Sequence, residues 1–202
     1  MKFEDTIYES EDISDRATFD LLPSELKELY LGINGVVAFN GGLYLRGCVI
    51  EPKWLSLWEI WKGDTALSKI YEHIDQADIP FAQDAFGDQF IWRAGQIYRL
   101  MMETGDLENL NLSLNDFFDE IFTDPVKFLI LEPLRELGRR GIVLVPGELM
   151  NVYPPFMFKF EGERSFKPVS SVEQIEYLQS IYIQTRNLSD GQKVRFKFDD
   201  KR

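Results

Sequence analysis

Residues 79–92, with the sequence IPFAQDAFGDQFIW, carry the clearest structural signal in this chain. Apolar residues lie on both sides of a short polar segment centred on Gly87. Glycine supplies the positive φ that a tight turn needs, and Asp88 beside it can bond its own backbone. Pro80 is compatible with the start of a strand or with a sheet edge. The stretch therefore predicts two strands joined by a turn.

The flanking sequence extends this pair into a larger sheet. Ala94-Gly95 turns the chain back into residues 96–103, which predicts a hairpin. Upstream, residues 36–40 and 43–49 are expected to form two strands across the Gly41-Gly42 turn. Three later strands are expected at the end of the chain, at residues 142–145, 156–160 and 194–198.

Helical spacing separates these strand clusters. It predicts helices at residues 22–33, 65–74, 113–122 and 125–138, and one opened by Ser171 to Gln174. Ser113 and Asp116 resemble a capping box, and Pro133 is expected to kink its helix. Strands and helices do not alternate as in βαβ units. The pattern predicts an α+β fold, with a single mixed or mainly antiparallel sheet flanked by helices.

The order of these features resembles the SUKH superfamily, which includes yeast cell-wall synthesis regulators of the Smi/Knr type and many bacterial proteins. A Leu-Pro helix, the Gly41-Gly42 strand pair, a Trp-rich segment, the 79–92 stretch and a Phe-rich helix follow one another in residues 22–122. The resemblance implies an α+β core and function by protein binding, since bacterial members are typically immunity proteins against secreted toxins. It transfers no catalytic residue.

The resemblance divides the chain into three parts of one domain. Residues 1–21 are expected to form an N-terminal acidic arm, residues 22–122 the SUKH-like core, and residues 123–202 a C-terminal extension packed on that core. A chain of 202 residues is long enough to bury a sizeable core without a disulfide or metal.

Composition narrows the possible chemistry. The chain has one Cys and one His, so it holds neither an internal disulfide nor a Cys/His zinc site, and a Cys-His or Ser-His relay would have to use His73. We expect His73 to be an ordinary helix residue. Asp78, Asp84 and Asp88 could ligate a hard cation, but their spacing is not that of a calcium loop, so no metal and no cofactor is expected.

Trp54, Trp58 and Trp61 follow helical spacing, which favours packing, although one exposed indole could anchor a partner. The N-terminus lacks an apolar run after a basic start, and no run is long enough to span a bilayer. These features favour a cytoplasmic protein that does not bind membranes. The oligomeric state is left open.

Charge is concentrated in one segment. The formal net charge is -12, and residues 70–124 contain 12 acidic side chains against Arg93 and Arg99. One interpretation is a solvated acidic face that maintains solubility. The other is a docking surface for a basic protein, through the nine acidic residues Asp75, Asp78, Asp84, Asp88, Glu103, Asp106, Asp116, Asp119 and Glu120.

These observations predict a protein without enzymatic activity that binds and neutralises a polymorphic toxin, possibly a nuclease, through its acidic surface. Nucleic acid itself is not an expected partner, because a chain of this charge repels it. An alternative is a regulatory or scaffold protein that binds endogenous partners in cell-envelope control. A third hypothesis is an enzyme that uses a carboxylate dyad in a cleft near the central hairpin.

Overall fold

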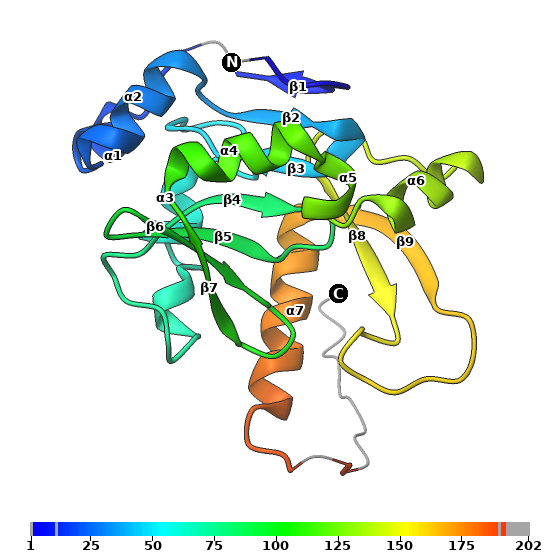
Figure 1. Ribbon diagram of the computed structural model, residues 1–202. Coiled ribbons are helices and arrows are strands. Elements are labelled where there is room, and N and C mark those ends of the chain that lie inside the picture. The colour runs from blue at the N-terminus through cyan, green and yellow to red at the C-terminus, as the bar shows by residue number, and fades with distance from the viewer. Residues whose placement is uncertain (1, 11, 190, 193–202) are drawn as a thin grey trace.

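The computed structural model describes residues 2–10, 12–189 and 191–192 (Figure 1). Its main element is a seven-stranded sheet in which every neighbouring pair is antiparallel and the strand order follows the chain. The strands are β1 (Tyr8–Glu9), β2 (Val36–Ala38), β3 (Leu43–Leu45), β4 (Ile79–Asp84), β5 (Gln89–Arg93), β6 (Gln96–Leu100) and β7 (Leu107–Leu112). The α+β prediction is confirmed.

The 79–92 stretch forms the centre of this sheet. β4 and β5 pair through Gln83 and Gln89, with an irregularity in register between Pro80 and Ala82. The Ala94-Gly95 turn joins β5 to β6, and both of its residues have positive φ, at 49° and 85°. Such turns match the twist of antiparallel strands. The predicted hairpin is confirmed.

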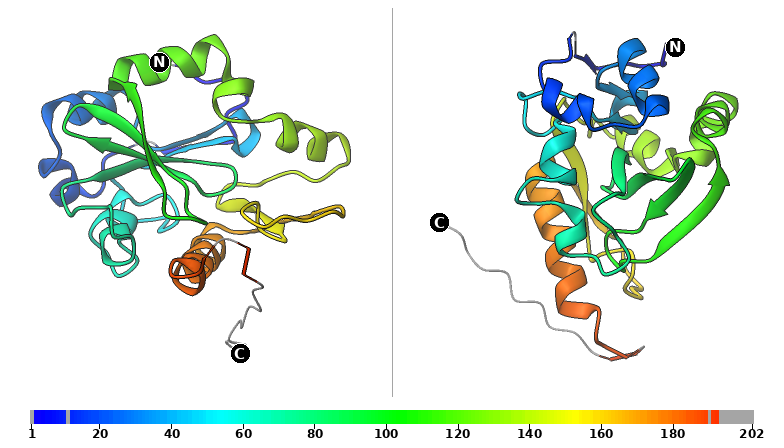
Figure 2. Two further views of the ribbon diagram at one scale, coloured as in Figure 1. Left: turned by 60° about the horizontal axis from the view of Figure 1, so that its bottom comes forward. Right: turned by 90° about the vertical axis from the view of Figure 1, so that its left-hand side faces the viewer.

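One face of the sheet is covered by α2 (Ser24–Gly32) and α4 (Leu114–Thr123) (Figures 1 and 2). Leu26 and Phe117 from these helices join a buried cluster with Phe81 and Phe90 of the central strands. The Ser113–Asp116 capping box is present at the start of α4. Because successive strand residues point to opposite faces, Ile91, which follows Phe90 in β5, packs in the cluster on the other side of the sheet.

The opposite face is covered by α7 (Ser171–Thr185), together with α3 (Leu57–Trp61) and the 3-10 turn η2 (Leu67–Lys69). Leu178 and Tyr182 of α7 pack in one buried cluster with Tyr44, Ile91 and Leu100 of the sheet. The C-terminal extension therefore supplies one side of the main core. Ser170 caps α7 by accepting from the backbone N–H of Glu173, one residue earlier than the sequence indicated.

A second, two-stranded sheet lies beside the main one. It consists of β8 (Glu148–Tyr153) and β9 (Ser165–Ser170), whereas the sequence predicted a single sheet. The connecting segment contains α5 (Pro125–Phe128) and α6 (Glu132–Arg139). Leu134 and Leu137 of α6 pack with Met150 of β8 in a third buried cluster.

The N-terminal arm is part of the fold. Phe3 is buried in the main cluster, β1 extends the sheet beyond β2, and α1 (Arg16–Asp20) follows it. The described part of residues 1–21, which were expected to form an N-terminal acidic arm, therefore packs on the core. Phe3 is buried by packing against the rings of Phe39 and Phe118, which lie far from it in the sequence.

Several predicted elements differ from the structure. Residues 142–145 and 156–160 are not strands, and only η2 forms within the predicted 65–74 helix. The 125–138 helix is divided by Ile130, whose φ is 53°, and Pro133 lies in the first turn of α6 and does not kink it. Pro is accommodated there because its missing N–H is not needed. The predicted 194–198 strand lies outside the described residues.

None of the helices in the described part of the chain combines the length and apolarity that crossing a bilayer requires.

Candidate functional site

The structure divides the nine predicted partner-binding residues into three groups. Asp78 and Asp84 are buried, and Asp88 and Glu103 are partly buried. The other five are exposed: Asp75, Asp106, Asp116, Asp119 and Glu120. The prediction that Asp78 and Asp84 contact a partner is wrong, because side chains that are 3% and 1% exposed present no surface for docking.

Arg99 of β6 joins two of these acidic residues. Its Nη2 atom donates to Oδ2 of Asp84 at 2.7 Å and to Oδ2 of Asp88 at 3.0 Å. Strand register explains the convergence, because β5 pairs with β6 and the turn after β4 ends at Asp88. Two carboxyl groups therefore share a single guanidinium.

Asp84 also organises the turn between β4 and β5. Its Oδ1 atom accepts hydrogen bonds from the backbone N–H groups of Phe86, Gly87 and Asp88. Oδ1 of Asp88 accepts from the backbone N–H of Met102, beyond the end of β6. The cluster therefore ties the β4–β5 turn to the segment that leads into β7.

Burial, followed by repulsion from Asp88, raises the pKa of Asp84 to about 7, although Arg99 and the turn amides oppose the shift. Burial is also the largest cause of the raised pKa of Asp88. A carboxyl pKa near neutrality is common at catalytic sites, but ion-pair networks of purely structural importance show it as well. The hydrogen bonds of the cluster distinguish the two cases.

A pocket of about 480 Å³ opens over this cluster. Its walls are mainly apolar and include Phe156, Met157 and Ile130, and Glu103 lies among them. The two oxygens of Glu103 accept from the backbone N–H groups of Phe156 and Met157, at 3.0 and 2.7 Å. Burial raises the pKa of Glu103.

All six carboxylate oxygens of Asp84, Asp88 and Glu103 therefore already accept hydrogen bonds from the protein. A general acid or base needs a proton position within reach of substrate. These oxygens point instead to backbone amides and to Arg99. This arrangement favours a structural function for the three carboxylates over a catalytic dyad.

Asp78 is held in a similar way by the second arginine of the acidic segment. Nε of Arg93 donates to its Oδ1 at 2.7 Å, and Nη2 of Arg93 donates to its Oδ2. The backbone N–H of Asp75 also donates to Oδ2 of Asp78, at 2.7 Å. His73 is exposed and accepts from Arg93 through its backbone carbonyl, and it lies in a turn and not in the predicted helix.

The exposed carboxylates of residues 70–124 do not pair with Arg93 or Arg99. Glu72 pairs with Arg186 at 3.4 Å. Within the described residues, no ion pair forms to the other seven, which are Asp75, Asp106, Glu108, Asp116, Asp119, Glu120 and Asp124. α4 and β7, which contribute four of them, lie on the side that faces the viewer in Figure 1.

The tryptophans largely pack, as the sequence favoured. Trp61 is buried and its Nε1 donates to the Gln76 carbonyl, and Trp54 makes an edge contact with Tyr44. Trp58 is 40% exposed, so it is the one indole of the stripe that has substantial surface.

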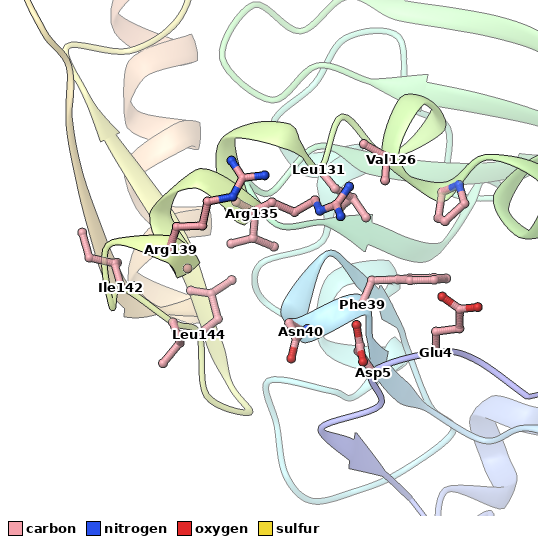
Figure 3. Close-up of a pocket in the computed structure, with 14 residues that line it drawn as sticks. Glu4, Asp5, Phe39, Asn40, Val126, Leu131, Arg135, Arg139, Ile142 and Leu144 are labelled. Atoms are coloured by element: carbon pink, nitrogen blue, oxygen red, sulfur yellow. The ribbon is translucent and has the colours of Figure 1, made fainter.

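Sequence reasoning missed a second pocket of about 480 Å³, where the N-terminal segment meets α6 (Figure 3). Figure 3 shows Arg135 and Arg139 of α6 across from Glu4 and Asp5. Arg139 already pairs with Glu136 on its own helix, at 2.7 Å. The lining residues come from three distant parts of the sequence, so no local motif indicates the pocket.

Comparisons with known proteins give no match: no family model, no curated protein and no solved structure matches the chain. Among the described residues, no group of three or more His, Cys, Asp or Glu side chains is arranged to hold a metal ion.

Proposed function

We propose that this protein is a cytoplasmic, non-enzymatic immunity-type protein that binds and neutralises a basic toxin domain through its exposed acidic surface. The observation that carries the proposal is the placement of charge in residues 70–124. Arg93 and Arg99, the two cations of this segment, point inward to Asp78, Asp84 and Asp88. The exposed carboxylates are left without cationic neighbours from their own segment.

Such a surface is costly for an isolated protein and useful for a binding protein. Like charges on one fold repel each other and lower its stability. A negative field speeds association with a basic partner and disfavours acidic competitors. A nuclease toxin has a basic cleft for phosphate groups, so an acidic surface that covers the cleft would block it. The resemblance of residues 22–122 to SUKH proteins agrees with this function.

The carboxylate dyad hypothesis receives less support. It requires two carboxylates that can exchange protons with a substrate. Asp84 and Asp88 share Arg99, and the carboxylate of Asp84 accepts from backbone N–H groups of the β4–β5 turn. The spacing of the two residues in the chain fits that turn. The pocket above them therefore serves packing and contacts with a partner in this proposal, and the protein catalyses no reaction.

The test is association with the product of a toxin gene adjacent to the gene of this protein. The full chain is expected to bind that toxin and to inhibit its activity. Replacement of Glu108, Asp119 and Glu120 by Lys is expected to lower the association rate. Asp116 is left in place because it belongs to the capping box of α4, and its loss would destabilise the helix.

The matched control replaces three exposed acidic residues outside the segment, Glu28, Asp64 and Glu161, by Lys. This variant has the same net charge as the first. Equal loss of association in both variants would show a net-charge effect and contradict a localised surface. Absence of binding to every neighbouring toxin would contradict the immunity function and favour a regulatory protein with endogenous partners.

A further inference from the structure

Three large apolar side chains with substantial exposed surface gather at the pocket over Asp84 and Asp88. Ile130, Phe156 and Met157 line this pocket of about 480 Å³, and they are 49%, 47% and 36% exposed. Single exposed apolar side chains are common, whereas a gathered group marks a site of contact. The volume falls within the range of about 300–1,000 Å³ that ligand pockets occupy. The pocket therefore has room for a large side chain.

Ile130 contributes to this wall at a conformational cost. It lies between α5 and α6, and its φ of 53° is in the left-handed region. A β-branched residue is strained there, because its Cβ comes close to the backbone. The half-exposed side chain gains little burial in return. Strain of this kind is concentrated at binding sites, so contact with a partner explains the placement of Ile130 better than packing within the chain does.

The loop after β8, which contributes Phe156 and Met157, is fixed by two charged side chains. Glu103 accepts from the backbone N–H groups of both residues. Nη2 of Arg164 donates to the backbone carbonyl of Phe158 at 2.7 Å. A loop that is already ordered loses less conformational entropy when a partner binds. This part of the apolar wall is therefore formed before a partner arrives.

The charged groups of the pocket favour one class of occupant. Arg99, the cation among the lining residues, is shared by Asp84 and Asp88. Glu103 and Glu108 also line the pocket, and they repel a nucleotide or another phosphorylated ligand. Glu108 is exposed, and no ion pair forms to it within the described chain. An apolar group with a positive charge beside it complements the apolar walls and Glu108 together.

We propose that this pocket is the anchor site of the toxin interface, and that it receives one aromatic side chain of the toxin that has a Lys or Arg beside it. The basic residue pairs with Glu108, which lies on the exposed acidic surface as well as at the pocket. The choice of a toxin as the partner rests on the proposed function, and the pocket adds the chemistry of the contact.

The pocket and the acidic surface have different kinetic effects. Exposed charges at the rim of an interface act mainly on the association rate and its salt dependence. An aromatic anchor that fills a desolvated pocket acts mainly on the dissociation rate. Variants of the pocket are therefore distinguishable from variants of the surface.

The first measurement needs no toxin. The full chain, with labelled Ile and Met methyl groups, is titrated by NMR with tryptamine, an indole that carries an ammonium group. The methyl signals of Ile130 and Met157 are expected to shift and to saturate. Indole-3-acetate, which carries a carboxylate on the same ring, is expected to bind at least about fivefold more weakly. No saturable shift with tryptamine, or equal affinity for the two compounds, would overturn the site.

The second measurement is the dissociation rate of the complex with the toxin encoded beside the gene of this protein. Phe156→Ala is expected to raise this rate at least about fivefold and to change the association rate by less than about twofold. Phe160→Ala is the matched control, because Phe160 belongs to the same loop and is 45% exposed but does not line the pocket. It is expected to leave both rates unchanged. A complex that dissociates at the same rate with Phe156→Ala would overturn the anchor, even if tryptamine binds.

Ile130→Gly separates binding from folding. Glycine adopts a φ of 53° without strain, so the thermal midpoint of this variant is expected to equal or exceed that of the unmodified protein. Tryptamine binding is expected to weaken, and the toxin complex to dissociate faster, because part of the apolar wall is lost. A lower midpoint with unchanged binding would show that Ile130 serves packing and would overturn its role at the anchor. Absence of binding to every neighbouring toxin would contradict the proposed function, whereas the tryptamine titration still tests the chemistry of the pocket.

Discussion

The buried and the exposed acidic residues of residues 70–124 differ in how their charge is compensated. Inside, Asp78, Asp84 and Asp88 share the segment's two arginines and receive backbone hydrogen bonds. Outside, seven carboxylates have no ion pair within the described chain. The difference shows that the excess of acidic residues in this segment serves two purposes. The compensated carboxylates hold turns in place, and the uncompensated ones lie at the surface, where a partner can reach them.

The largest expected effect comes from removing the cation that two buried carboxylates share. Arg99→Met leaves Asp84 and Asp88 without their counter-charge, so it is expected to lower the free energy of unfolding by about 3–5 kcal/mol. Denaturant unfolding at neutral pH measures this. Arg139→Met, at an exposed and ion-paired arginine, is the control and is expected to cost at most about 1 kcal/mol. Equal losses in the free energy of unfolding in the two variants would contradict the distinction between buried and exposed ion pairs.

The next effect is a pH dependence that the buried cluster alone produces. Because the pKa of Asp84 is raised from 3.8 to about 7, the folded state retains a proton that the unfolded state has lost between these values. Stability therefore falls as pH rises through this window. Asp84→Asn does not titrate, so the unmodified protein is expected to lose stability relative to it from pH 4 to 7. A constant difference between the two proteins would contradict the raised pKa.

These buried clusters show where sequence reasoning succeeds and fails. Local chemistry predicted the β4–β5 turn around Gly87, the Ala94-Gly95 hairpin and the capping box at Ser113, because each depends on neighbouring residues. The ion pair of Asp84 with Arg99 depends on strand register, which brings together residues that the sequence separates. The charge composition alone therefore led to the wrong prediction that Asp84 lies on the surface.

The same reasoning explains the missed elements. Residues 107–112 lack a strict apolar alternation, and β7 forms because β6 provides a free edge. The N-terminal segment joins the sheet in the same way, through β1. The pocket over Asp84 and Asp88 gave no signal in the sequence, since its walls come from distant parts of the chain. Features that depend on long-range pairing were thus outside the reach of local patterns.

A smaller effect is expected where one carboxylate is paired with a single, partly exposed arginine. Asp78→Ala removes two hydrogen bonds from Arg93 and one from the backbone N–H of Asp75. The expected cost is about 1.5–3 kcal/mol, since Arg93 can be partly solvated after the change. Chemical denaturation compares this variant with Asp75→Ala, whose exposed side chain is expected to matter little. A larger loss of unfolding free energy in Asp75→Ala than in Asp78→Ala would contradict the structural importance given to Asp78.

The smallest effect on stability is expected at the exposed carboxylates. Glu108→Lys, Asp119→Lys and Glu120→Lys are each expected to change the free energy of unfolding by no more than about 0.5 kcal/mol. Lys near the end of α4 also suits the helix dipole. Thermal and denaturant unfolding of the single variants measure the effect. A loss above about 2 kcal/mol in any of them would mean that these residues serve the fold.

The most direct measurement is the association rate of the protein with the toxin encoded beside it, at low and at high salt. Electrostatic steering raises such rates by about 10- to 1,000-fold and is screened by salt. We expect the triple reversal of Glu108, Asp119 and Glu120 to lower the association rate at least about tenfold at low salt. At high salt its rate is expected to approach that of the unmodified protein. Its loss of rate at low salt is expected to exceed that of the control with Glu28, Asp64 and Glu161 reversed. An association rate at low salt that the reversal leaves unchanged would contradict the acidic surface as the binding site.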